Sequence, residues 1–205
     1  MYLYGASGHG KVIKEIIESQ GEKITGFIDD NESINIFAGL PVIHSITKIV
    51  DELIISIGIN KTRKAIVEKV LCNCLSKFAE AVFHKNAIIS DSASLGIGTV
   101  VMGGAIINAD SRIGKHCIVN TGASIDHDCI INDYVHISPH ATLCGNVTIG
   151  EGSWIGAGST VIQGVTIGRW SLIGAGSVVT KDVPDGYMAV GNRCKLVKKI
   201  NQEMI

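Results

Sequence analysis

The most regular feature of the chain is a hydrophobic repeat of six residues that runs from Ile88 to Val183. Cut into sixes from Ile88, this stretch of 96 residues gives 16 hexads without a gap. The second position of each hexad is Ile, Leu or Val, and the sixth is Ala, Ser, Thr, Cys or Val. A period of six does not keep one face of an α-helix, which repeats every 3.6 residues. The repeat therefore predicts a solenoid of short strands with a corner every six residues.

The same repeat predicts how the solenoid is filled. Three hexads close one coil of 18 residues, so the aliphatic side chains at the second position stack inside the coils and the small ones fit near the corners. The chain has 24 glycines but only 3 prolines, and glycine suits corners that need a positive φ. With strands ~4.8 Å apart, we expect about five coils and a prism roughly 25 Å tall.

The first 83 residues follow a different pattern, in which short apolar strands alternate with amphipathic helices. We expect strands at Tyr2–Tyr4, Ile24–Ile28, Leu53–Ile57 and Ala81–Phe83, and a helix over Thr62–Cys72, besides one that follows Gly10. The expected buried faces comprise Val12, Ile13, Ile16 and Ile17 on the first helix, and Ile66, Val67, Val70 and Leu71 on the second. This alternation predicts a small Rossmann-like α/β domain with a parallel sheet over residues 1–83, followed by the solenoid domain over residues 84–205.

The turn after the first strand contains glycines spaced G-x-x-G-x-G, from Gly5 to Gly10. Glycines between a strand and a helix present backbone N–H groups to phosphate, and Asp29 lies where an acidic residue would meet a ribose. A nucleotide-like ligand is favoured. An NAD site is the rival interpretation, which the short domain and the lack of a following dehydrogenase domain disfavour. A tight turn without a ligand is the remaining alternative.

The balance of acidic and basic residues bears on which macromolecules the protein could bind. With 18 basic and 19 acidic residues and a net charge of -1, the chain offers no evident surface for nucleic acid. No apolar run approaches 18 residues, so no membrane span is expected. The N-terminus has no basic region before an apolar stretch, so we expect a cytoplasmic protein with free cysteines. The six cysteines are scattered without zinc-site spacing, and no metal is expected.

Five segments together carry a family resemblance: YGASGHGKV, FIDD, SIG, IVNTGASIDHDC and HISPHATLCGNVTIG. Across essentially its whole length the chain resembles the hexapeptide-repeat sugar O-/N-acyltransferases, which include UDP-N-acetylbacillosamine N-acetyltransferases and sialic acid O-acetyltransferases. The resemblance implies a left-handed parallel β-helix, with acetyl-CoA as the acyl donor. It also implies a homotrimer whose acetyl-CoA sites lie between neighbouring prisms.

His127, in the sequence Ile125-Asp126-His127-Asp128, is the best catalytic candidate. A sugar amine or hydroxyl must lose a proton as it attacks a thioester, and a neutral imidazole accepts protons near pH 7. A neighbouring carboxylate raises the basicity of the imidazole. The resemblance implies that role for Asp128, and Asp126 is a second candidate. The alternative is an exposed turn histidine without chemistry.

The resemblance also implies two sets of binding residues. For acetyl-CoA these are His136, Gly145, Ala157 and Ala175, with the Gly145 N–H on the thioester oxygen. A polar outer-face residue is the alternative reading of His136. For a nucleotide-linked sugar they are Ser7, Gly8, His9, Asp29, Asp30, Gly58 and Asn120. The basic tail over 191–199 either meets the CoA phosphates or is the solvated end of a helix.

These observations favour an acetyl-CoA-dependent N-acetyltransferase that acts on a UDP-linked 4-amino-4,6-dideoxy sugar in bacterial surface-glycan synthesis. His127 would act as general base in a direct transfer. The first alternative is an O-acetyltransferase of sialic acid or another sugar. The second is a scaffold that binds a nucleotide sugar and has no activity.

Overall fold

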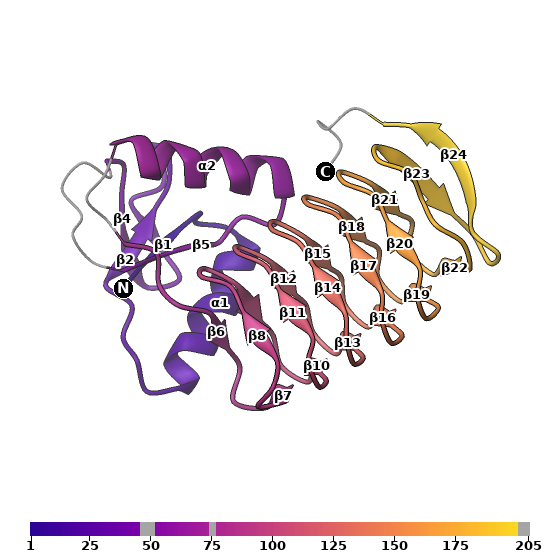
Figure 1. The fold of residues 1–205 in the computed structure, drawn as a ribbon. Helices are drawn as coiled ribbons and strands as arrows, with labels where there is room; N and C mark the ends of the chain where they lie inside the picture. Colours follow the sequence, from indigo (N-terminus) through magenta and orange to yellow (C-terminus); the bar gives the residue numbers. More distant parts are fainter. Residues whose placement is uncertain (46–51, 74–76, 201–205) are drawn as a thin grey trace.

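The computed structural model describes residues 1–45, 52–73 and 77–200. Figure 1 shows a small α/β unit that packs against the first coils of a long solenoid, with the C-terminal strands at the far end. None of the helices in these ranges is long and apolar enough to cross a membrane.

The N-terminal unit has one five-stranded sheet in the order β3-β4-β2-β1-β5. Strands β4, β2, β1 and β5 are parallel, and β3 is antiparallel to β4. The elements are β1 (Tyr2–Tyr4), α1 (Gly8–Ser19), β2 (Gly26–Ile28), β3 (Ile36–Phe37), β4 (Leu40–Ile43), β5 (Leu53–Ile55) and α2 (Asn60–Asn73). The α/β prediction for this part of the chain is therefore confirmed.

Some details of that prediction were wrong. The hairpin of β3 and β4 was not predicted, and Val12 and Leu71 are exposed rather than inward. The strand at Val82–Phe83, β6, does not join the N-terminal sheet; it pairs with β9 (Val100–Val101) of the solenoid. Pairing with β9 buries Val82 beneath α1, which a local pattern does not reveal. The division into domains at residues 83 and 84 stays a prediction.

The solenoid follows the predicted hexads residue by residue. Each strand from β7 to β22 covers the first two positions of one hexad, and each pairs in parallel with strands 18 residues away. The remaining strands of this series are β7 (Ile88–Ile89), β8 (Ser94–Leu95), β10 (Ile106–Ile107), β11 (Arg112–Ile113), β12 (Ile118–Val119), β13 (Ser124–Ile125), β14 (Ile130–Ile131), β15 (His136–Ile137), β16 (Thr142–Leu143), β17 (Thr148–Ile149), β18 (Trp154–Ile155), β19 (Thr160–Val161), β20 (Thr166–Ile167), β21 (Leu172–Ile173) and β22 (Val178–Val179). The parallel β-helix is confirmed.

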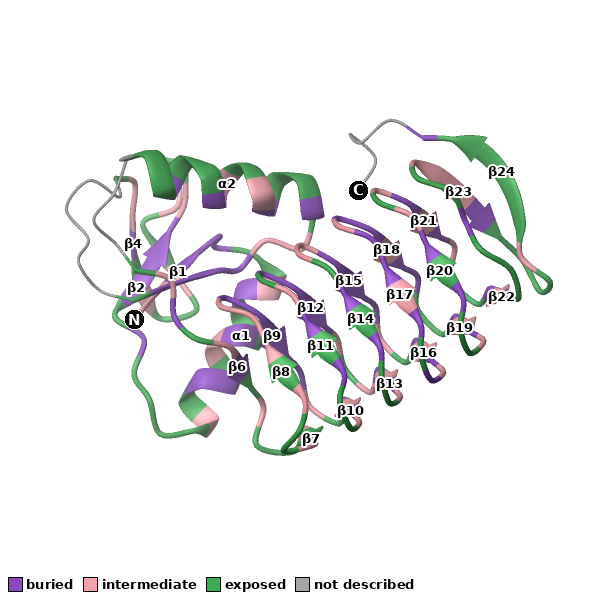
Figure 2. Ribbon diagram, in the orientation of Figure 1, coloured by how far each residue is buried: buried purple, intermediate pink, exposed green. Residues whose placement is uncertain are grey.

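The solenoid has three faces because successive strands belong to three different sheets. One sheet runs from β7 through β13 to β22, the second from β8 through β14 to β20, and the third contains β9, β12, β15, β18 and β21. We call them the β13 face, the β14 face and the β15 face. All second-position side chains except the first two are buried, which builds one continuous core (Figure 2).

The last strands close the far end of the β-helix. β23 (Tyr187–Val190) pairs in parallel with β21, and β24 (Lys195–Lys199) pairs antiparallel with β23. Here the regular repeat ends, and a hairpin covers the last coil. Side chains of β24 are exposed along the whole strand.

Helix α1 lies between the N-terminal sheet and the β15 face. Ile13, Ile16 and Ile17 pack with Leu3 of the sheet, and this cluster continues into Val100, Met102 and Ile118 of the solenoid. On the other side of the sheet, Val67 and Val70 of α2 pack against Tyr4, Ile28 and Ile55. The two units thus share a core, which fixes the carboxyl ends of the N-terminal strands near the β15 face.

Candidate active site

His127 and Asp128 lie at the corner between β13 and β14, and both side chains are more than half exposed. The Nδ1 atom of His127 lies 2.7 Å from Oδ2 of Asp128. Asp128 has a φ of 58°, a left-handed conformation that aspartate adopts more readily than most residues. The corner therefore turns the carboxylate back onto the imidazole, and Nε2 remains available on the other side of the ring.

Asp126 forms hydrogen bonds that hold the backbone of the same corner. Its Oδ1 accepts hydrogen bonds from the His127 backbone N–H at 2.8 Å and from Nδ2 of Asn108 at 3.0 Å. These bonds lower the pKa of Asp126. The hydrogen bond to Asp128, followed by the charge of Asp126, raises the pKa of His127 above 6.5. Both carboxylates thus increase the basicity of the imidazole, as expected for a proton acceptor.

Gly145 lies beside His127 because it has no side chain. A Cβ atom at position 145 would come 2.6 Å from Cε1 and 2.7 Å from Nε2 of His127. The two residues line one cavity of about 590 Å³ together with Asp126, Cys144, Asn146, Gln163 and Gly164. His127 therefore faces an open cavity, with the backbone of Gly145 at its wall.

His136 and Asn120 lie elsewhere in the chain, on the β15 face toward the N-terminal unit. His136 is only 6% exposed and stacks on Trp154, with 4.7 Å between the ring centres. Its Nε2 lies 3.2 Å from Nδ2 of Asn120. The corner that carries His127 joins the other two faces, so the structure does not bring His136 and His127 together within one chain.

The expected nucleotide residues come mainly from the carboxyl ends of three neighbouring parallel strands. Ser7 and Gly8 are exposed at the start of α1, and His9 lies in its first turn. The Asp29 carboxylate accepts from the backbone N–H of Ala6 at 2.8 Å, which joins the ends of β1 and β2. Gly58 follows β5. The order β2-β1-β5 brings these segments together, as at ligand sites of other parallel sheets.

Asp30 has protein partners of its own. Its carboxylate accepts a hydrogen bond of 2.6 Å from the Tyr4 hydroxyl and pairs with Lys69 at 3.0 Å. Burial raises the pKa of Asp30, but the bonds from Tyr4 and Lys69 outweigh it and the net shift is downward. The carboxylate thus links the end of β2 to helix α2.

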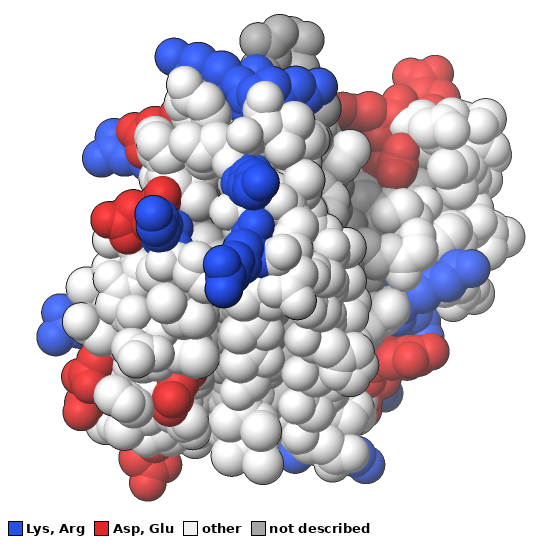
Figure 3. Space-filling model, turned by 90° about the vertical axis from the view of Figure 1, so that its right-hand side faces the viewer, with Lys and Arg blue, Asp and Glu red and all other residues white. Residues whose placement is uncertain are grey.

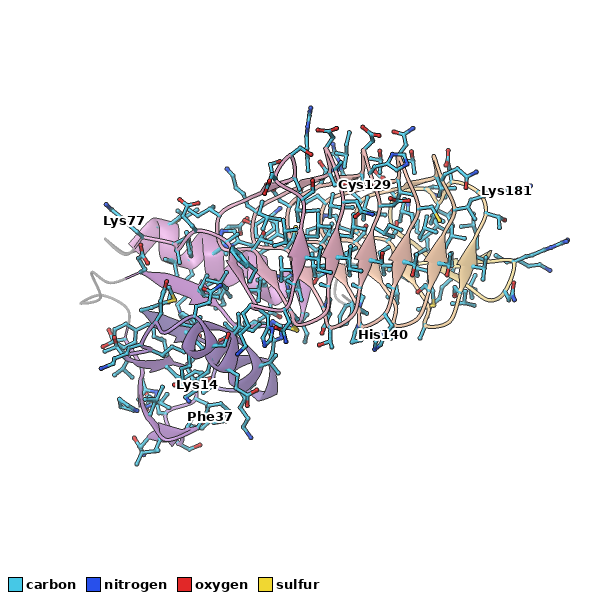
Figure 4. The ribbon with its side chains drawn as sticks, turned by 90° about the horizontal axis from the view of Figure 1, so that it is seen from below. Lys14, Phe37, Lys77, Cys129, His140 and Lys181 are labelled. Carbon is cyan, nitrogen blue, oxygen red and sulfur yellow. The ribbon has the colours of Figure 1, made fainter. Side chains whose placement is uncertain are left out.

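Ala157 and Ala175 are exposed at a third row of corners, between the β15 face and the β13 face. His140 belongs to the same row, and Figure 4 shows it and the neighbour of the His127 corner, Cys129, at opposite edges of the β13 face. A second cavity, of about 670 Å³, lies at the C-terminal end; Lys181, Arg193 and Lys195 line it with Asp182. Figure 3, which views this end, shows Lys and Arg side chains on a mostly uncharged surface.

Comparison with known proteins decides the family. Residues 1–70 match the PglD N-terminal domain model, and residues 110–145 and 146–181 match the bacterial transferase hexapeptide model. The structure superposes on perosamine N-acetyltransferase from Caulobacter crescentus, in complex with CoA and GDP-perosamine, with a TM-score of 0.90 and 35% identity over 96% of each chain. The chain belongs to the hexapeptide-repeat sugar acyltransferases.

Two further solved structures match nearly the whole chain. The acetyltransferase domain of PglB from Neisseria gonorrhoeae FA1090, in complex with acetyl coenzyme A, shares 36% identity over 96% of this chain and 98% of that one, with a TM-score of 0.86. WeeI from Acinetobacter baumannii AYE shares 30% identity over the same fractions, with a TM-score of 0.88. The resemblance inferred from the five sequence motifs is thus confirmed.

The structure of this acyltransferase also brings forward residues that sequence reasoning missed. Asn60 and Arg63 in the first turn of α2 are buried, although their polar side chains suggest a solvated helix start. Trp154 stacks on His136 and donates from Nε1 to the Ser138 hydroxyl at 2.7 Å. The contacts of Asn60 and Arg63 have no local signal, because their solenoid partners are distant in sequence, whereas Trp154 lies one 18-residue coil after His136. Within the described ranges, no group of His, Cys, Asp or Glu side chains is arranged to hold a metal ion.

Proposed function

We propose that this acyltransferase transfers an acetyl group from acetyl-CoA to the amine of a nucleotide-linked amino sugar in the cytoplasm. The finer proposal is a UDP-linked 4-amino-4,6-dideoxy sugar that serves bacterial surface-glycan synthesis. The observation that carries the proposal is the His127 imidazole, held at Nδ1 by Asp128 and open at Nε2 to a cavity. The Caulobacter relative, crystallised with CoA and GDP-perosamine, supports this class of acceptor.

In the proposed reaction His127 acts as general base. Nε2 takes the proton that the amine loses as it attacks, and the carboxylate of Asp128 stabilises the imidazolium that forms. The C–N bond forms as the C–S bond of acetyl-CoA breaks, and CoA leaves as the thiol after taking the proton from the His127 imidazolium, so no acyl-enzyme is required. The Gly145 N–H, which makes no hydrogen bond within the described part of the chain, would donate to the thioester oxygen as that oxygen gains charge.

Several residues of the chain have side chains suited to contact with acetyl-CoA. The bare backbone at Gly145 lets a narrow group pass close to His127. Exposed Ala157 and Ala175 have short side chains, against which a pantetheine arm would lie. Lys181, Arg193 and Lys195 at the C-terminal cavity are suited to the CoA phosphates. We therefore assign the donor to this set of residues, together with His136 as the sequence resemblance implies.

The separation of these residues within one chain supports a homotrimer. His127 and Gly145 lie at one edge of the β13 face, and Ala157 and Ala175 lie at its other edge. The outward residues of that face in β13, β16 and β19 are Ser124, Thr142 and Thr160, whose side chains are short. If three copies turn their β13 faces to a common axis, the two edges meet across each boundary. The N-terminal unit of one copy would then serve His127 of the next.

The decisive experiment is an acceptor panel with acetyl-CoA, read by release of free thiol. The panel contains UDP-linked, GDP-linked and CMP-linked amino sugars and free sialic acid. We expect turnover with a nucleotide-linked amino sugar. Turnover with sialic acid alone would favour the alternative O-acetyltransferase, and no thiol release with any acceptor would favour a binding scaffold.

His127→Ala tests the general base. We expect turnover to fall by about 10²- to 10⁴-fold, the usual contribution of such a group, with the oligomeric state and acetyl-CoA binding unchanged. His84→Ala is the matched control, because it removes a histidine at the start of the solenoid, between β6 and β7. Unchanged turnover in His127→Ala would remove the catalytic assignment.

A further inference from the structure

Arg63 is a buried cation at the junction of the two units. Its side chain is 1% exposed, and among the described residues no carboxylate pairs with it. Burial lowers its pKa to about 10, so the guanidinium remains charged at neutral pH. Burying a charge without a counter-ion costs free energy unless hydrogen bonds replace those lost from water. The hydrogen-bond partners of Arg63 therefore decide what the residue does.

Every N–H of the guanidinium has an acceptor. Nε donates to the His116 carbonyl at 2.8 Å, and Nη1 donates to the carbonyls of Ile57 and Gly58 at 3.0 Å each. Nη2 donates to Oδ1 of Asn60 and to the Tyr134 carbonyl, both at 2.8 Å. Arginine has five such donors, so none remains for a phosphate. Arg63 therefore does not bind the anionic part of a ligand.

These bonds attach α2 to a row of solenoid corners. His116, Tyr134 and Gly152 follow one another at intervals of 18 residues, so they occupy the same corner on three successive coils. Arg63 binds the carbonyls of the first two, and Nδ2 of Asn60 donates to the Gly152 carbonyl at 3.0 Å. The acceptors are backbone atoms, so the attachment fixes the height of α2 along the prism.

The other side of the guanidinium holds the loop that follows β5. This loop includes Gly58, one of the residues expected to bind the nucleotide sugar, and the Nη1 bonds reach both Ile57 and Gly58. His9 and His136 lie close enough for the charge of Arg63 to lower the pKa of each, after the larger effect of burial. One side chain thus connects the expected acceptor loop, the prism and two imidazoles.

We propose that Arg63 is a positioning residue that holds the Ile57–Gly58 loop at a fixed place against the solenoid, so that the sugar nucleotide is presented at the right depth. The inference rests on the proposed function, because it names the acceptor as the ligand that the loop presents. Arg63 acts through the loop: its hydrogen bonds reach neither His127 nor any residue assigned to the acetyl donor, and at His136 only its charge acts. Its loss should therefore weaken the use of one substrate only.

The test compares Arg63→Met and Arg63→Lys with the control Lys64→Met in steady-state kinetics. Lys64 lies on the same helix and pairs with Glu151 of the solenoid at 2.6 Å, but no bond joins it to the loop. In Arg63→Met we expect the KM for the nucleotide sugar to rise by about tenfold or more, with the KM for acetyl-CoA within about twofold. Arg63→Lys should be intermediate, and the control should match the wild type.

Equal changes in both KM values, or none, would overturn the proposal, as would the same acceptor defect in Lys64→Met. If Arg63→Met does not fold, the kinetics of Arg63→Lys decide in the same way. The crystal structure of Arg63→Lys gives a readout without activity: we expect the Ile57–Gly58 loop to move away from the His116 corner. An unmoved loop overturns the proposal, whereas a wild-type enzyme without turnover on any nucleotide sugar overturns the proposed function instead.

Discussion

At the scale of single residues, the reactivity proposed for His127 depends on a conformation as well as on neighbouring charges. Asp128 reaches the imidazole at 2.7 Å because its backbone is left-handed at that corner. Gly145 leaves the space in which the ring lies. Asp128 thus supplies a charge next to the imidazole, and Gly145 leaves room for the ring because it has no side chain. Substitution of each residue tests the two effects separately.

Asp128→Asn should change the pH dependence of the reaction. The bond from Asp128 raises the pKa of His127, and a general base works only when neutral, so kcat/KM should fall as the pH drops through that raised pKa. Without the carboxylate the pKa falls, and the acid limb should move to lower pH while the plateau decreases. A pH–rate profile measures both changes. An acid limb at an unchanged pH would show that another group titrates.

Gly145→Ala should impair catalysis without unfolding the protein. The added Cβ would overlap the His127 ring, which is exposed and can swing away, so the fold is retained but the base is displaced. We expect kcat to fall by about tenfold or more, since small misplacements of a catalytic group are costly. Thermal unfolding should shift little. Gly164→Ala is not a suitable control, because the φ of Gly164 is 70° and alanine is strained there. Wild-type kcat in Gly145→Ala would contradict the proposed placement of the His127 ring beside Gly145.

At the scale of the elements, each strand of the β-helix has only two residues and depends on its neighbours in the stack. Ile131 of β14 is 2% exposed, whereas the adjacent Ile130 is 45% exposed on the outer face. Substituting each isoleucine in turn therefore compares the effect of a core side chain on the free energy of unfolding with that of an exposed one. On the same face, Arg112 and Thr166 are likewise exposed beside the buried Ile113 and Ile167, so one pair represents this face.

Ile131→Ala should lower the free energy of unfolding by about 2–5 kcal/mol, the usual cost of a buried Ile→Ala change that leaves a cavity. Ile130→Ala should lower it by less than about 1 kcal/mol. Urea unfolding of both variants measures the difference. Similar losses in the two variants would mean that the outer face is covered in solution, as an interface between copies would require.

At the scale of the whole molecule, three histidines lie near Arg63 where the two units meet: His116 and His136 are buried and His9 is half-buried. Burial and then the charge of Arg63 lower the pKa of His9 and of His116 to about 4, and burial, Arg63 and His9 lower that of His136 to about 3. Each of the three has a buried ring nitrogen without a hydrogen-bond partner in the described part of the chain. The junction thus disfavours the protonated form of each of these imidazoles.

Stability should consequently fall in mild acid. In the unfolded chain a histidine takes up its proton near pH 6.5, but in the folded chain these three do so only near pH 4 or below. The unfolded state therefore binds more protons between these values, and the free energy of unfolding decreases as the pH falls from about 6.5. Urea unfolding at pH 7.5, 6.5 and 5.5 measures the slope. His136→Gln should reduce it; a constant free energy would contradict the assignment.

Sequence and structure agree best where the determinants are local. The hexads placed all strands from β7 to β22, because a period of six with an aliphatic second position is compatible with few folds other than a triangular solenoid. The corner at Asp126-His127-Asp128 could also be recognised, since its three side chains are adjacent in sequence. The buried roles of Asn60 and Arg63 could not, because the solenoid carbonyls to which they donate are more than 50 residues away.

By itself, then, the sequence determined the two kinds of domain, the strands of the repeat and the candidate base with its carboxylate. The tertiary structure decided that β6 belongs to the solenoid, that Arg63 is a buried connection, and that His136 and His127 lie on different sides of one prism. The physical reason is the sequence separation of the residues that interact. Strand repeats and corners depend on residues that are near one another in the chain. The junction of the two units depends on contacts between faces that are far apart in sequence, and a local pattern does not specify such contacts.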